Sequence, residues 1–160
     1  MKTLKWGTSY GMNPFKIYTK NTRFSFFKKK EEYHLDGEIT FLDNRILIND
    51  TVFSIDALNA ITFPSFDDYK GKIINSVDNN VSDGVSNIVE LHGKDGKKTI
   101  YYFQLDYRYQ MRDLREQLIQ YHQAGKLDFI NLTNILGLES FNAIQNFKNE
   151  LPNGGNIKSY

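Results

Sequence analysis

The stretch GEITFLDNRILINDTVFSIDALNAITF, residues 37–63, decides the fold. Apolar and polar residues alternate along it, and two turn signals, Asp43-Asn44 and Asn49-Asp50, interrupt the alternation. Alternation with a period of two indicates strands with one buried face, and short turns join antiparallel neighbours. The stretch therefore predicts an antiparallel meander.

Strand patterns continue on both sides of this stretch. Upstream they begin at Phe15, and the apolar positions of the two expected strands are Phe24, Phe26, Tyr33, Leu35, Ile39 and Phe41. Downstream, residues 88–92 and 98–105 flank Gly93-Lys94-Asp95-Gly96, whose Asp-Gly is a strong hairpin signal. Residues 64–87 are rich in Asn, Asp, Ser and Gly, and we expect a mobile segment there with strand fragments at Tyr69 and Ile73-Ile74.

A helix is expected next, over residues 107–124. Its apolar stripe recurs at spacings of three and four, at Tyr107, Met111, Leu114, Leu118 and Tyr121. Asp106 is the expected N-cap and Gly125 the expected stop. Two shorter helical patterns follow, one after Asp128 and one ending at Pro152.

Residues 37–63, together with IVELHGKDGKKTIYYFQL (residues 88–105) and the helix after it, resemble the pleckstrin-homology (PH) superfamily, especially its bacterial and GRAM-like members. The resemblance covers about residues 23–125. It implies a mainly β (α+β) fold, in which a curved antiparallel sheet or barrel is capped by a C-terminal amphipathic helix. Many eukaryotic members carry a tryptophan in that helix, whereas the only tryptophan here is Trp6.

This resemblance divides the chain into four parts. Residues 1–22 form an N-terminal arm, residues 23–125 the PH-like domain, residues 126–151 a helical extension packed on or beside it, and residues 152–160 a flexible tail. The chain has 160 residues, which suits one domain.

Composition excludes several classes of function. The chain contains no cysteine, which removes thiol catalysis and thiolate metal sites and fits a reducing compartment. A net charge of +1 offers no global attraction to nucleic acid, so we expect no nucleic-acid partner. No apolar run approaches the ~20 residues needed to span a bilayer. We expect a soluble, cytoplasmic protein without a cofactor.

Phosphoinositide-binding members of the family hold the head group with basic residues on the first two strands and the loop between them. The matching residues here are Lys20, Arg23, Lys28, Lys29 and Lys30. Glu31 and Glu32 follow at once, so the alternative is a solvated, charged hairpin that protects a sheet edge.

Residues 75–90, NSVDNNVSDGVSNIVE, approach the pattern of a calcium loop. An EF-hand needs oxygen ligands at positions 1, 3 and 5, glycine at 6 and glutamate at 12. Starting at Asp78 leaves Val89 at the glutamate position, and starting at Asn79 leaves Val81 at position 3. Neither register works. His34, His92 and His122 lack the close spacing of a metal motif, so we expect no metal site.

These observations favour a non-catalytic PH-like recognition module that binds another protein, because no catalytic motif is found. The expected partner-binding residues lie on the last helical pattern: Phe141, Ile144, Phe147 and Leu151. The first alternative is a peripheral membrane module that binds anionic lipid head groups through the first hairpin. The second is an enzyme or small-ligand binder whose residues gather from distant strands.

Overall fold

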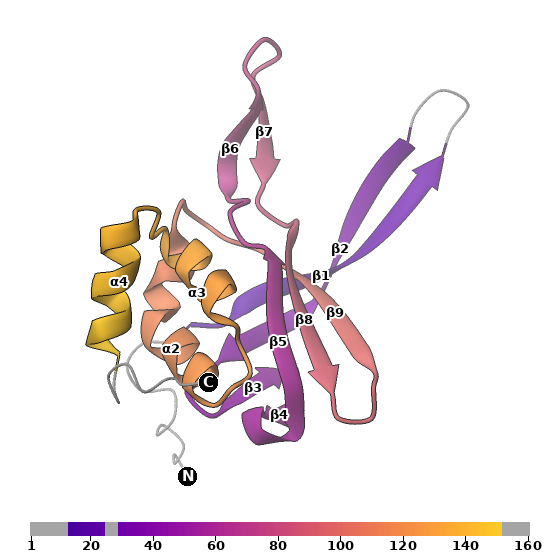
Figure 1. Ribbon diagram of the computed structural model, residues 1–160. Coiled ribbons are helices and arrows are strands. Elements are labelled where there is room, and N and C mark those ends of the chain that lie inside the picture. The colour runs from indigo at the N-terminus through magenta and orange to yellow at the C-terminus, as the bar shows by residue number, and fades with distance from the viewer. Residues whose placement is uncertain (1–12, 25–28, 152–160) are drawn as a thin grey trace.

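The computed structural model describes residues 13–24 and 29–151. Its elements (Figure 1) are β1 (Phe15–Phe24), β2 (Lys29–Phe41), β3 (Arg45–Ile48), β4 (Thr51–Ser54), the 3-10 helix η2 (Ile55–Ala57), β5 (Leu58–Ser65), β6 (Lys70–Asn75), β7 (Asn80–Asp83), β8 (Asn87–Gly93), β9 (Lys98–Phe103), the 3-10 helix η3 (Gln110–Leu114), α2 (Arg115–Gln123), α3 (Phe129–Leu136) and α4 (Phe141–Glu150). The expected mainly β architecture with C-terminal helices is confirmed.

Seven strands form one antiparallel sheet in the order β4-β3-β2-β1-β9-β8-β5, and β6 and β7 form a separate two-stranded ribbon. The meander from β1 to β4 and the hairpin β8–β9 meet where Ile17 pairs with Phe103. β4 and β5 are therefore the two edges of the large sheet.

Aromatic side chains occupy the centre of the core. Phe15, Phe41, Phe63 and Phe103 contact one another with ring centroids 5.6 to 6.3 Å apart. Contacts at this separation, mostly edge to face, are favourable beyond the area that they bury. Many of the aromatic residues in this sequence thus pack in the core, as expected for strand residues that face inward.

Strand β1 corrects the expected domain boundary. Residues 15–22 were assigned to an N-terminal arm, but they belong to a strand in the middle of the sheet, where Phe15 and Ile17 are buried. The far halves of β1 and β2 extend beyond the core as a ribbon (Figure 1), so Leu35, expected on the core face, is 63% exposed.

Helix α2 covers the interior of the curved sheet (Figure 1). Met111, Leu114, Leu118 and Tyr121 are buried as the stripe predicted, and the Tyr121 hydroxyl donates to the Leu42 carbonyl at 2.6 Å. The predicted start of this helix, at residue 107, was wrong. Tyr109 has a left-handed backbone with a φ of 65°, and the helical turns begin at Gln110 as a 3-10 segment.

The expected cap at Asp106 is also wrong. No side chain caps η3 or α2, and the Asp106 carboxylate instead approaches the Lys70 ammonium at 3.6 Å. The other end agrees with the prediction, because Gly125 follows the helix with a positive φ.

Helices α3 and α4 pack onto the rest of the chain and share its single core. Asp128 caps α3 by accepting from the Asn131 N–H, and Ser140 caps α4 by accepting from the Ala143 N–H. The segment contributes these buried side chains: Leu127, Leu132, Ile135, Leu136, Phe147 and Leu151. Residues 126–151 are therefore part of the domain.

Candidate functional site

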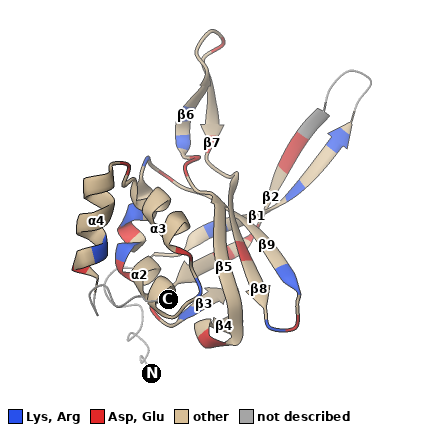
Figure 2. Cartoon of the chain, viewed as in Figure 1, with Lys and Arg blue, Asp and Glu red and all other residues tan. Residues whose placement is uncertain are grey.

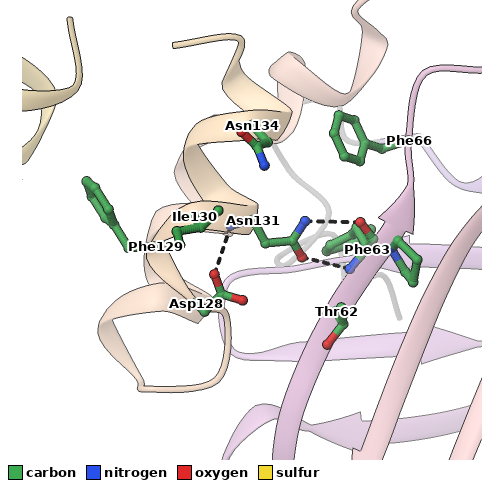
Figure 3. Close-up of a pocket in the computed structure, with 9 residues that line it drawn as sticks. Thr62, Phe63, Phe66, Asp128, Phe129, Ile130, Asn131 and Asn134 are labelled. Atoms are coloured by element: carbon green, nitrogen blue, oxygen red, sulfur yellow. Dashed lines mark hydrogen bonds between the residues drawn. The ribbon is translucent and has the colours of Figure 1, made fainter. Parts of the chain in front are cut away.

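A groove of about 670 Å³ lies between the end of β5 and the start of α3 (Figure 3). We call it the α3 groove. It is lined by Thr62, Phe63, Pro64, Phe66, Asp128, Phe129, Ile130, Asn131 and Asn134.

Hydrogen bonds between α3 and the outer edge of β5 form the floor of this groove. The Phe63 N–H donates to Asn131 Oδ1 at 2.8 Å, and Asn131 Nδ2 donates to the Phe63 carbonyl at 3.0 Å (Figure 3). The Ile61 N–H donates to the Lys126 carbonyl at 2.8 Å. One amide side chain thus makes the pair of bonds that a neighbouring strand would make, and the β5 edge is closed to strand addition there.

The apolar side chains that line the groove differ in exposure. Ile130 is 71% exposed, whereas Phe66 and Phe129 are half-buried. Phe129 points away from Phe66 (Figure 3) and stacks on Phe147 of α4 with ring centroids 6.1 Å apart. The groove thus combines an exposed isoleucine with aromatic residues in its lining, and aromatic residues are enriched at protein interfaces.

The β6–β7 ribbon begins four residues after Phe66 and projects away from the sheet (Figure 1). Its aliphatic side chains are exposed: Ile73 by 66%, Ile74 by 62%, Val77 by 88% and Val81 by 51%. Ile73 and Val81 are register partners. Ile74, next along the strand, points to the opposite side, so both faces of the ribbon carry apolar groups.

A polar network anchors the base of this ribbon. The Asp68 carboxylate accepts from the Ser82 hydroxyl at 2.5 Å and from the Ser86 hydroxyl at 2.6 Å. Asn87, which is fully buried, accepts from the Asp68 N–H and donates to the carbonyls of Asp68, Gly84 and Phe103. Together, these hydrogen bonds hold the ribbon to the large sheet.

The residues considered for calcium lie in this ribbon and its base. Asp78 contacts the Asn75 amide in the turn, and Ser82 donates to Asp68. Within residues 13–24 and 29–151, no group of three or more His, Asp or Glu side chains has the arrangement of a metal site.

The three histidines lie apart in separate local contacts. His34 lies 3.8 Å from Glu32, and His92 lies 3.4 Å from Glu90. His122 Nδ1 lies 2.8 Å from the Leu127 carbonyl.

Two of the five candidate head-group residues, Lys20 and Arg23, form cross-strand ion pairs. Lys20 Nζ lies 3.1 Å from Glu31, and Arg23 Nε lies 3.3 Å from Glu32. The hydrogen bond to Glu31 raises the pKa of Lys20, against a smaller lowering by burial. Lys28 lies outside the described residues, and of Lys29 and Lys30 only the backbone, in β2, is described. Basic and acidic residues are interspersed along β1 and β2 (Figure 2).

The expected partner-binding residues at the last helix differ in their exposure. Phe147 and Leu151 are each 3% exposed and belong to the core, and Ile144 is half-buried. Phe141 alone of the four is largely exposed, by 74%. This set does not form one apolar surface, because two members pack inward.

Sequence reasoning missed the α3 groove. The sequence predicts a helix after Asp128, and α3, whose first residue is Phe129, begins there. However, no pattern linked these residues to Phe66, which comes from the segment expected to be irregular.

A scan against protein-family models found no match, and searches of curated proteins and of solved structures found none either. Among the described residues, no helix is long and apolar enough to cross a membrane.

Proposed function

We propose that this chain is a non-catalytic, PH-like recognition module that binds a partner protein through the α3 groove. The observation that carries the proposal is Ile130, 71% exposed at the edge of a groove with aromatic walls. Burying an isoleucine side chain stabilises a complex by about 1.5–3 kcal/mol. The exposed aliphatic residues of the adjacent β6–β7 ribbon extend the apolar surface that a partner would cover.

The PH-like part of the proposal is supported by the order of the elements. With the β6–β7 ribbon set aside, a four-strand meander is followed by a three-strand meander whose last strand pairs with β1. A helix that fills the interior comes next. Ile55 and Ile61, which lie near the end of the stretch of residues 37–63 that carries the resemblance, are both buried.

Binding to anionic lipid head groups receives less support than protein binding. Two of its five candidate cations already face glutamates at 3.1 and 3.3 Å. A phosphate group would have to displace these carboxylates, which repel it. If the lipid alternative were correct, vesicles containing anionic lipid would retain the protein at low salt and release it as salt is raised. A cytoplasmic location is part of the proposal, in keeping with a chain that lacks cysteine.

Affinity capture with paired variants tests the proposal. Wild type, Ile130→Asp and Phe141→Asp are compared, because Ile130 and Phe141 are similarly exposed, at 71% and 74%, and only Ile130 lines the groove. We expect wild type and Phe141→Asp to retain the same protein and Ile130→Asp to retain about tenfold less. Equal retention by a folded Ile130→Asp variant would contradict the assignment of the groove.

A further inference from the structure

The two edges of the large sheet differ. The β5 edge is covered by Asn131 of α3 and by the backbone of Lys126, which precedes that helix. At the other end, β4 pairs with β3 on one side only, and within residues 13–24 and 29–151 no strand pairs with its outer side. A strand with an unpaired row of N–H and C=O groups is a template for another strand.

Apart from its shortness, four residues, β4 has none of the features that protect an edge. Thr51, Val52, Phe53 and Ser54 include no charged residue and no proline, and Val52 is 61% exposed. Natural proteins usually protect an exposed edge with lysine, proline, a bulge or a covering element. As far as residues 13–24 and 29–151 are concerned, the β4 edge is therefore available for pairing.

A second groove, of about 430 Å³, runs beside this edge. We call it the β4 groove. It is lined by Val52, Phe53, Ser54, Ala57, Leu58, Leu91, Gly93, Lys94, Asp95, Lys97 and Thr99. Phe53 and the buried Leu58 and Leu91 give it an apolar interior, while the β8–β9 turn supplies its charges.

The charges of the β4 groove favour an acidic occupant. Lys94 and Lys97 are exposed, and neither forms an ion pair with another described residue. The Asp95 carboxylate faces its own turn, where it accepts from the Lys97 N–H at 3.0 Å. Residues 1–12 and 152–160 contain lysine and no Asp or Glu, so these ends of the chain do not supply acidic side chains.

We propose that an extended, acidic segment of a partner protein adds to the β4 edge as an eighth strand of the large sheet. Its backbone pairs with Thr51–Ser54. Alternate side chains fall on one face of a strand, so the face turned toward the β4 groove can present an apolar side chain to its interior and carboxylates to Lys94 and Lys97, which line the same groove. The proposal rests on the proposed role in protein recognition but uses a different surface from the α3 groove.

Fluorescence polarisation with a labelled peptide tests this inference. The probe is the hexapeptide Glu-Glu-Val-Val-Glu-Glu, in which each face of the extended chain carries one valine between two glutamates. It is compared with one that has lysine in place of glutamate, and with one whose alternate backbone nitrogens are methylated. The protein is wild type, Lys94→Glu/Lys97→Glu, or the charge-matched control Lys16→Glu/Lys148→Glu, whose sites are exposed and outside the groove.

We expect saturable binding of the acidic peptide with a dissociation constant at or below about 1 mM. The Lys94→Glu/Lys97→Glu variant should bind about tenfold more weakly, since two charge contacts are reversed. The control variant should bind as wild type does, and methylation should abolish binding, since it removes backbone donors. Hydrogen exchange at Thr51–Ser54 should slow when the peptide is bound.

Three results would overturn the inference. The first is no saturable binding of the acidic peptide, and the second is binding that charge reversal or methylation leaves unchanged. The third is concentration-dependent self-association that Val52→Lys abolishes, which would assign the β4 edge to a second copy of the chain. Ile130→Asp leaves the β4 groove intact, so peptide binding by that variant separates this inference from the α3 groove assignment.

Discussion

At the scale of single residues, Asn131 performs a task that normally needs a whole strand. Its amide both accepts from and donates to the backbone of Phe63, and its own N–H donates to the Asp128 carboxylate. These bonds fix α3 against the sheet edge and so define the floor of the α3 groove. Removing the amide leaves two partly buried backbone groups unpaired.

Asn131→Leu should therefore lower the free energy of unfolding by about 1–3 kcal/mol. It should also promote association through the newly freed β5 edge. Asn134→Leu, on the same helix at an exposed position, is the matched control and should change stability by less than about 0.5 kcal/mol. Chemical denaturation and sedimentation measure the two effects. Equal stability of both variants would refute the role given to Asn131.

Tyr121 joins α2 to the turn after β2. Its ring is buried, its hydroxyl donates to the Leu42 carbonyl at 2.6 Å, and burial, followed by the charge of Asp43, raises its pKa well above the ordinary value. A raised folded-state pKa adds stability below the unfolded-state pKa of about 10, and this stability is lost as pH rises further.

Tyr121→Phe should cost about 1–3 kcal/mol at neutral pH, because the Leu42 carbonyl is left unpaired in the core. It should also flatten the fall in stability above about pH 10, because the group that resists ionisation is gone. Denaturation curves at several alkaline pH values measure both effects. The interpretation fails if wild type and variant lose stability in parallel over that range.

At the scale of elements, the position of the β6–β7 ribbon depends on a close approach of three backbone segments. Gly84 has a φ of 76°, and a Cβ there would lie 2.5 Å from both the Leu105 carbonyl oxygen and the Lys70 nitrogen. Those atoms belong to the backbone and cannot rotate away. Glycine is required at this point for space as well as for its backbone conformation.

Gly84→Ala should be clearly more destabilising than Gly71→Ala. Gly71 also has a positive φ, of 90°, but a Cβ there meets nothing within 4 Å. Gly71→Ala should cost about 1 kcal/mol from the backbone conformation, and Gly84→Ala at least about twice that. Hydrogen exchange should speed up across β6 and β7 in Gly84→Ala. Similar stability of the two variants would contradict the steric requirement for glycine at position 84, because the ribbon would then move aside at little cost.

The sequence predicted most elements whose signals are local. The hairpin at Gly93–Gly96, the helix start after Asp128 and the stop at Gly125 depend on neighbouring residues, and each is where it was expected. The start of the helix at Tyr107 failed because local side-chain contacts compete with the first helical turn. Tyr107 donates to Asp113, and the Asp106 N–H donates to Gln110 Oε1, so a left-handed turn at Tyr109 precedes the first helical turn.

At the scale of the whole molecule, the α3 groove could not be predicted because its parts are distant in sequence. Asn131 and Phe63 are 68 positions apart, and Phe66 lies in a segment with no clear period. The sequence did predict that residues 126–151 are helical. That they complete the core follows only from the structure, in which Leu132, Ile135 and Phe147 share one buried cluster with the strand residues. Cutting the chain at Gly125 would remove those core residues, so point variants test the groove better.

The most direct test of the central claim is site-specific photo-crosslinking in cells of the source organism. A photoreactive phenylalanine analogue replaces Ile130 in one sample and Phe141 in another, two positions of similar exposure. The account predicts a discrete crosslinked protein from position 130 that is absent or much weaker from position 141. No discrete product from position 130, or the same products from both positions, would contradict the claim that the α3 groove binds a partner protein.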